Sequence, residues 1–199
     1  MSKLKKEKLI GYSISGPDNY GYMNYDQYEV NICDCIDYVR NRRLHVSPNF
    51  KMKKAQYDFS FTFDSYLIVS DRFKDFCTKN NYEGINFYPL NNYPKRFFMD
   101  ILNVKRFDTI RKAKHLEYIE FNPRCNEYNE VVGPNPLCLV DNEALTDGFF
   151  RTDLEFGRSY AKGPEYLVGI ETWKKMRMET FKGLYTSEIL TKYDWEENL

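Results

Sequence analysis

The stretch YLIVSDRFKDFCTKNNYEGINFYP, from Tyr66 to Pro89, decides the fold of this chain. It opens with a short apolar, partly β-branched run, which favours a strand. Ser70 follows where the N-cap of a helix belongs, and an acidic residue stands in the first turn. Phe73, Phe76 and Cys77 then recur at helical spacing and make one apolar stripe. Asparagines and a glycine end the helix before a second apolar run. The stretch therefore predicts a strand, a capped helix, a glycine turn and a strand.

The same order of features returns in YLVGIETWKKMRMETFKGLYTSEI, from Tyr166 to Ile189. Glu171 and Trp173 each stand 100 positions after an acidic and an aromatic counterpart in the first stretch. Trp173 and Met176 lie at i and i+3, so we expect both in the core with the apolar stripe of the first helix. Chance similarity is the alternative, because strand–helix–strand segments are common.

These two stretches predict an α+β fold, with one or more mixed sheets and two similar strand–helix–strand units packed on a shared core. The chain has 199 residues, which suits a single domain over 1–199. Two lobes, at about 1–122 and 123–199, are the alternative division.

The remaining elements are expected from local patterns. Apolar runs predict strands, the strict alternation over 57–63 predicts a half-buried strand, and clusters of Gly, Pro and Asn predict loops. On this basis strands are expected at 9–15, 25–32, 57–63, 97–102, 116–121 and 137–140, a marginal helix at 35–44, and loops at 122–136 and 156–164.

Composition indicates a folded chain with neither a membrane span nor a leader. Apolar residues make up 42% and charged residues 29%, which is typical of a globular domain. No apolar run approaches the length of a signal peptide or a membrane helix, so we expect a cytoplasmic protein. The 29 basic and 29 acidic residues cancel, so no global field draws the chain to nucleic acid or a membrane. The frequent aromatic residues, 17 Tyr and 15 Phe, suit protein recognition or reflect a compositional bias.

A search for catalytic and metal-binding patterns finds none that is specific. Cys33 and Cys35 are too closely spaced for a zinc pair and lack a second pair, so we expect five free cysteines and no metal. No nucleophile elbow, phosphate-cradling loop or metalloprotease helix is present, so we expect no cofactor and no catalytic residue. An enzyme using Cys and His residues, or a nucleic-acid-binding module using the basic stretch Arg40–Lys54, remains the alternative function.

Three motifs occur in a distinctive order. They are YLIVSDRFKDFCTKNNYEGINFYPL, then KRFFMDILNVKRFDTIRKAK, then DGFFRTDLEFGRSYAKGPEYLVGIETWKKMRMETFKGL. This order resembles the immunity proteins of bacterial polymorphic toxin systems, in the group numbered eleven, with the forty-third group as a near alternative. The resemblance covers about 57–189. Gly169 and Ile170 depart from it, because Val and Ser are usual there in the second copy.

The resemblance implies a non-catalytic protein that binds a cognate toxin and neutralises it sterically, with no cofactor. Since the repeated segments are expected in the core, the toxin should meet loops and charged surface. Two regions are candidates for binding the partner, because Tyr offers a large contact area and acidic rims steer a basic partner. One is a Tyr-rich loop with Asp18, Tyr20, Tyr22 and Tyr25, and the other is an acidic stretch with Glu127, Tyr128 and Glu130.

Overall fold

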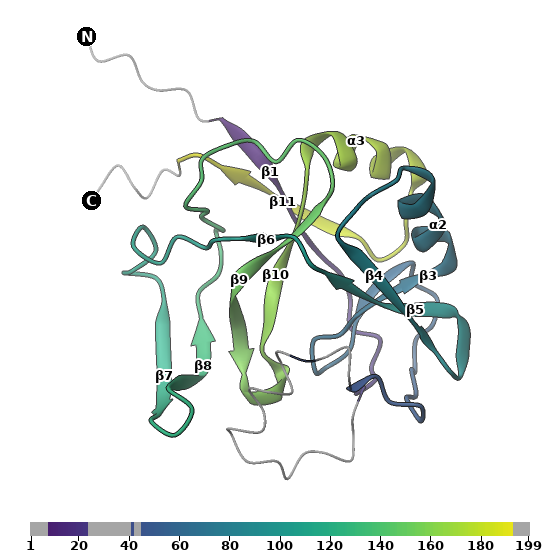
Figure 1. Cartoon of the computed structure of the whole chain (residues 1–199), viewed down its shortest axis with the longest axis horizontal. Helices are drawn as coiled ribbons and strands as arrows, with labels where there is room; N and C mark the ends of the chain where they lie inside the picture. The colour runs from purple at the N-terminus through teal and green to yellow at the C-terminus, as the bar shows by residue number, and fades with distance from the viewer. Residues whose placement is uncertain (1–7, 24–40, 42–44, 193–199) are drawn as a thin grey trace.

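A computed structural model describes residues 8–23, 41 and 45–192, and within them it contains two β-sheets and two α-helices (Figure 1). The larger sheet, here sheet A, has the strand order β11-β1-β10-β9-β8-β7, and β6 pairs beside β9. Its strands are β1 (Leu9–Ser15), β6 (Val104–Lys105), β7 (Glu117–Asn122), β8 (Glu127–Val132), β9 (Phe149–Arg158), β10 (Gly163–Val168) and β11 (Tyr185–Leu190).

The smaller sheet, here sheet B, has the order β2-β3-β5-β4. Its strands are β2 (Phe59–Phe61), β3 (Leu67–Ser70), β4 (Ile85–Leu90) and β5 (Tyr93–Ile101). Pairing is antiparallel in both sheets, except that β6 runs parallel to β9, so sheet A is mixed. Helix α2 (Asp71–Lys79) follows β3, and helix α3 (Ile170–Glu179) follows β10. The expected α+β class is therefore confirmed, and sheet A is mixed as expected, whereas sheet B is antiparallel.

Helix α2 begins as its sequence predicts. The side-chain oxygen of Ser70 accepts a hydrogen bond from the backbone N–H of Phe73 at 3.2 Å, and its hydroxyl donates to Oδ1 of Asp58 at 2.7 Å. Phe73, Phe76 and Cys77 are buried on one face of the helix. The turn after the helix contains Gly84 at φ +72°, a left-handed conformation that glycine adopts without strain. The cap, the stripe and the turn are confirmed.

Helix α3 starts without a side-chain cap, because Gly169 occupies the N-cap position. Its first N–H groups are satisfied by the preceding loop instead. The N–H of Ile170 donates to the carbonyl of Leu145, and that of Glu171 donates to the carbonyl of Thr146, each at 2.8 Å. A Cβ on Gly169 would lie only 2.7 Å from the backbone nitrogen of Asp147. This close approach explains why glycine stands at the N-cap of α3.

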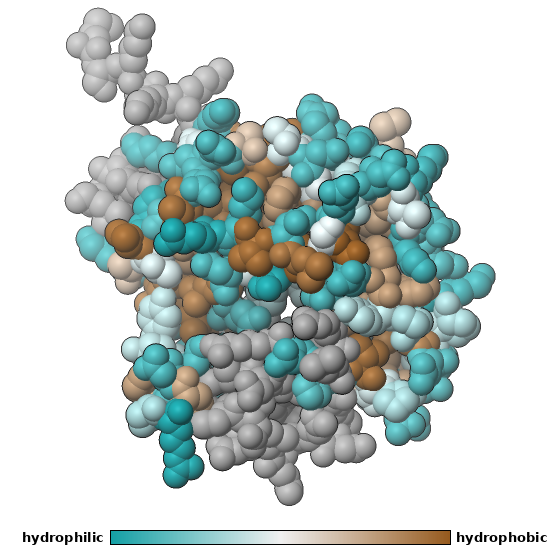
Figure 2. Space-filling view, viewed as in Figure 1, coloured by the Kyte–Doolittle hydropathy of each residue, from teal (hydrophilic) through white to brown (hydrophobic). Residues whose placement is uncertain are grey.

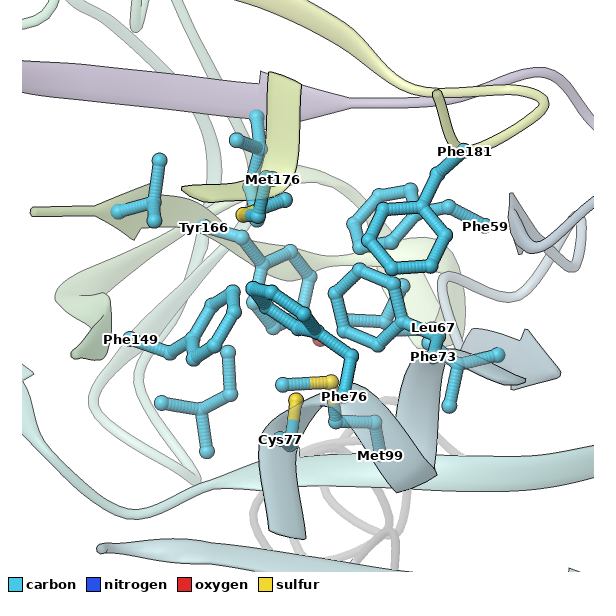
Figure 3. Packing of buried hydrophobic residues seen from close by; sticks show 14 residues of the cluster. Phe59, Leu67, Phe73, Phe76, Cys77, Met99, Phe149, Tyr166, Met176 and Phe181 are labelled. Atoms are coloured by element: carbon cyan, nitrogen blue, oxygen red, sulfur yellow. The ribbon is translucent and has the colours of Figure 1, made fainter. Parts of the chain in front are cut away.

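A central aromatic cluster fills the space between the two sheets and the two helices (Figure 3). The ring of Phe73 on α2 lies 4.9 Å from the ring of Phe181, which follows α3. It also lies 5.6 Å from Phe59 on β2 and 5.8 Å from Phe149 on β9. Met176 of α3 belongs to the same cluster. Apolar burial of this kind is the dominant stabilising term of a fold.

Smaller clusters cover the outer faces of both sheets, so the middle strands are buried on both sides. On β3, Leu67 and Val69 face the central cluster, whereas Ile68 joins the outer cluster of sheet B. On β10, Tyr166 faces the centre and Leu167 joins the outer cluster of sheet A. Burial on both faces explains why these strands read as continuous apolar runs.

Trp173 departs from its predicted place in the core. It is half-buried and packs against the ring of Tyr12, with centroids 5.4 Å apart. The fully buried residues of α3 are Thr172 and Met176. Thr172 lies on that face because its hydroxyl donates to Asp147 at 2.5 Å and accepts from the N–H of Gly148 at 2.6 Å. These hydrogen bonds turn Trp173 toward the edge of the cluster.

The predicted loop over 122–136 is wrong, because residues 127–132 form strand β8. Its prolines lie in the turn before the strand and in the segment after it, so none interrupts the pairing. The predicted loop over 156–164 is also shorter than expected, because β9 continues to Arg158 and β10 begins at Gly163.

Two predicted strands are shorter than expected. Only Phe59–Phe61 of the alternating segment pairs in sheet B, and loop 16–23 covers its outer side. Leu137–Val140 forms only one isolated bridge, from Leu139 to Phe107. The strand expected at 25–32 and most of the helix expected at 35–44 lie outside the described residues. Within the described part of the chain, no helix is long and apolar enough to cross a membrane.

Candidate interaction surface

Asn19 fixes the Tyr-rich loop at residues 16–23. Asn19 is completely buried. Its backbone N–H donates to the carbonyl of Phe61 at 2.8 Å. Its own carbonyl accepts from the N–H groups of Lys53 and Lys54, at 3.2 and 3.0 Å. The loop is thus joined to strand β2 and to the basic segment before it.

Three exposed rings cluster on this loop, and we call Tyr20, Tyr22 and Phe63 the loop cluster. Their exposed fractions lie between 36% and 45%. The ring of Phe63 lies 4.9 Å from that of Tyr22 and 5.9 Å from that of Tyr20. The ammonium group of Lys54 lies over the ring of Tyr20, 4.3 Å from its centre. Aromatic rings with a fixed backbone and an exposed edge suit protein recognition.

The structure places three of the four predicted residues of this loop. Tyr20 and Tyr22 belong to the loop cluster, and Asp18 is exposed beside them, where its backbone bridges to Phe61. Tyr25 lies outside the described residues. Tyr20 and Tyr22 are thus exposed at the surface, and the binding of a partner by this loop stays a prediction.

The second predicted region is a hairpin rather than a loop. Glu127, Tyr128 and Glu130 lie on β8, which pairs with β7 at one end of sheet A (Figure 1). Strand β7 has no further neighbour among the described strands, so it is an edge strand. The acidic residues are consequently held by a backbone ladder.

A second group of exposed rings lies on this hairpin, and we call Tyr118, Phe121 and Tyr128 the hairpin cluster. Tyr128 lies 5.0 Å from each of the other two rings. Residues three apart on a regular strand point to opposite faces. Glu120, between Tyr118 and Phe121, has φ +56°, and this left-handed residue breaks the regular alternation so that both rings reach Tyr128. Its carboxylate accepts a hydrogen bond from Asn129 at 2.6 Å.

The hairpin carboxylates are paired within the chain. Glu120 and Glu130 lie 3.6 and 3.9 Å from the guanidinium of Arg158. Glu127 lies 3.9 Å from the ammonium of Lys162. These contacts are long and partly exposed, so each contributes little stability. They nevertheless neutralise much of the charge that the sequence places on this stretch.

Both clusters flank one 3-10 turn, η3 (Ser159–Ala161). On one side, the hydroxyl of Ser65 donates to the carbonyl of Ala161 at 2.6 Å, two residues after Phe63. On the other side, the ammonium of Lys162 donates to the carbonyl of Tyr128 at 2.9 Å. The segment that carries Phe63 and strand β8, far apart in sequence, are therefore each hydrogen-bonded to Ala161 or Lys162.

The cysteines and histidines of the alternative function are dispersed. Burial raises the pKa of the Cys77 thiol, and Cys138 is fully buried. Burial lowers the pKa of the His45 imidazole. Among the described residues, no group of three or more His, Cys, Asp and Glu side chains is arranged to hold a metal ion. Cys33 and Cys35 lie outside the described residues.

Other surface features do not coincide with the predicted residues. Figure 2 shows apolar side chains over the β6 segment within a largely hydrophilic face, where Leu102 and Val104 are exposed. A shallow pocket of about 410 Å³ lies along α2 and at the C-terminal end of α3. Arg72 in its wall lies 3.6 Å from Glu179, also in the wall, and 3.4 Å from Asp58.

Sequence reasoning missed four residues of the surface. Phe63 is part of an alternating segment, so its spacing indicated a half-buried strand position. Tyr118 and Phe121 lie in an apolar run that indicated an ordinary strand. Lys54 belongs to the basic stretch, and nothing in its spacing indicates a contact with Tyr20. Only the fold brings these side chains to the two clusters.

A scan against protein-family models finds no family that matches this chain, and a search of curated proteins finds no match. What the chain does is therefore inferred from its motifs and from the geometry of this surface.

Proposed function

We propose that the chain is an immunity protein, which binds a cognate bacterial toxin and neutralises it by steric occlusion. The order of the three motifs supports this proposal. The observation that carries it is the pair of exposed ring clusters on either side of η3, because exposed aromatic rings are typical of protein-binding surfaces.

The geometry of the clusters suits tight recognition. Tyr and Phe offer large contact areas and lose few rotatable bonds on binding. The loop cluster stands on a backbone that Asn19 already holds, and the hairpin cluster stands on a paired strand. A surface ordered before binding avoids part of the entropic cost of association.

We further propose that the two similar stretches are equivalent units that share one core and act as scaffold. Each has a strand, a helix, and a glycine at positive φ after the helix, Gly84 at +72° and Gly183 at +82°. The contact between Phe73 and Phe181 joins them. Their side chains are committed to packing, which leaves the loops and the hairpin for the partner. A single domain in the cytoplasm, where a toxin would act, is part of the proposal.

The proposal expects a toxin gene immediately upstream of this one, and the test co-expresses the toxin domain of that gene with the chain. We expect protection of the host cell and a stable complex. Tyr22→Ala combined with Phe121→Ala should weaken binding about tenfold or more, because exposed hot-spot rings dominate interface affinity. Tyr185→Ala is the matched control, since Tyr185 is an exposed ring on β11, the opposite edge of sheet A. The proposal is contradicted if the wild type neither binds nor protects.

A second candidate function is the binding of single-stranded nucleic acid. The exposed Lys51 and Lys53 beside the loop cluster favour it, because lysines can hold a phosphate backbone while bases stack on exposed rings. Binding of an oligonucleotide that weakens steeply with salt, with no toxin complex, would favour this function over the first.

A further inference from the structure

We infer that the partner presents an acidic segment of polypeptide to the loop cluster, so that carboxylates meet this side of the surface. The inference deepens the proposed function and rests on it. It reverses the expectation from sequence, in which an acidic stretch of this chain meets a basic partner.

The charge beside the loop cluster is mainly basic, because three lysines stand there with one exposed carboxylate, that of Asp18. Lys51 and Lys53 are exposed, Lys54 is half-buried, and none of the three forms an ion pair within the described residues. Asn19 binds the N–H groups of Lys53 and Lys54 with its carbonyl, which holds this lysine segment against the loop that carries Tyr20. A partner would therefore meet exposed rings and ammonium groups together.

The acidic side of the surface is already occupied by cations of the chain itself. Arg158 lies between Glu120 and Glu130, and Lys162 faces Glu127. A basic partner would have to displace these cations before it gained a carboxylate. A carboxylate that arrives at Lys51 or Lys53 displaces no ion pair of the described residues, so no existing attraction is lost.

The ring geometry favours a carboxylate over a nucleotide base. Phe63 meets Tyr20 edge to face at 81° and Tyr22 at 48°, so the rings do not form a stacked platform. Lys54 covers one face of Tyr20. A base stacking there would have to move this ammonium, whereas a carboxylate can add a charge-assisted hydrogen bond to it and leave it in place.

The test measures the fluorescence anisotropy of a labelled peptide of alternating Glu and Ser residues around a central Trp, at low ionic strength. A peptide with Lys in place of Glu, and single-stranded oligo(dT), are the comparison probes. The variant is Lys51→Gln with Lys53→Gln. Lys114→Gln with Lys182→Gln is the matched control, because both lysines are exposed, form no ion pair with another described residue and lie outside the surface.

The acidic peptide should bind the wild type best, and the Lys51/Lys53 variant should weaken it about two- to thirtyfold, the effect of two exposed charge pairs. The control variant should bind as the wild type does. The inference is overturned if the wild type does not bind the acidic peptide, if either comparison probe binds more tightly, or if both variants lose affinity equally.

The toxin domain then separates the two proposals. A toxin that binds the wild type and the Lys51/Lys53 variant equally leaves the immunity function standing and overturns the acidic-segment inference. If the acidic peptide binds at the lysines but the toxin domain does not bind, the immunity function fails and the preference of the surface for acidic segments stands.

Discussion

Gly169→Ser should destabilise the protein, even though serine is a better helix N-cap than glycine. The residue begins α3, and its φ of −68° and ψ of 155° suit serine as well as glycine. The backbone conformation at residue 169 is therefore compatible with serine. The obstacle is the loop before the strand β9, which lies directly against the Cα of Gly169.

The sizes of two opposing effects, the gain in helix capping and the cost of crowding, determine whether Gly169→Ser stabilises or destabilises the protein. Serine in place of glycine at an N-cap stabilises a helix by only about a few tenths of a kcal/mol. The new Cβ would lie 2.7 Å from the nitrogen of Asp147 and 2.8 Å from the carbonyl carbon of Thr146, and both are backbone atoms. Crowding of this kind costs about 1–3 kcal/mol. Retreat of the loop would also lengthen the hydrogen bonds from Ile170 and Glu171 to its carbonyls. We expect a net loss of about 1–3 kcal/mol.

Urea denaturation followed by tryptophan fluorescence measures this loss as a lower midpoint at unchanged slope. Gly169→Ala is the informative companion, because it adds the Cβ without a capping oxygen and should be no more stable than Gly169→Ser. Ser70→Gly makes the opposite exchange in the first unit and should cost about 1 kcal/mol through the lost cap and the bond to Asp58. A Gly169→Ser midpoint equal to or above that of the wild type would refute the account of the missing cap.

Three further predictions follow from burial. Phe73→Ala should cost about 3–5 kcal/mol in the free energy of unfolding, because its ring is fully buried, whereas half-buried Trp173→Ala should cost clearly less; equal urea midpoints would contradict this. Burial raises the pKa of the Glu165 carboxyl above 4.5, so its ionisation opposes folding, and stability should fall as pH rises upward from about 4.5. Glu165→Gln should remove this part of the pH dependence of the urea midpoint, and an unaltered profile would count against it. Iodoacetamide should modify half-buried Cys125 before Cys77, whose thiol is buried and has a raised pKa; mass spectrometry of the native protein that finds Cys77 modified first would show the opposite.

The sequence predicted those helices and strands that are determined by interactions between residues close together in the chain. Ser70, the apolar stripe from Phe73 and the glycine turns act within a few residues of one another, so strand β3, helix α2 and strand β4 were predicted with their caps. The prediction of a loop at 122–136 was wrong because pairing between residues distant in sequence determines the structure there. The hairpin β7–β8 uses prolines only at its ends, and no local pattern separates that arrangement from a loop.

The candidate surface also has some features that the sequence predicted and others that only the fold determines. The Tyr-rich loop was predicted as exposed because its composition forbids a regular element, and Tyr20 and Tyr22 are indeed exposed. That Phe63 and Lys54 complete the cluster follows from the hydrogen bonds of Asn19 to two distant segments. The sequence could not show that the hairpin carboxylates are paired. Their partners, Arg158 and Lys162, lie about thirty residues further along the chain, in the strand and the turn that follow.

The sequence by itself therefore determined the α+β class, the capped helix of the first unit and the aromatic character of the surface, because propensity, capping and turn chemistry act between near neighbours. Tertiary structure alone decided that both ring clusters flank the turn at Ser159–Ala161 and which of the nearby charges are already paired. The physical reason is that hydrogen bonds and ion pairs depend on distances of a few ångströms between residues that the chain places far apart, and only the packed core sets those distances.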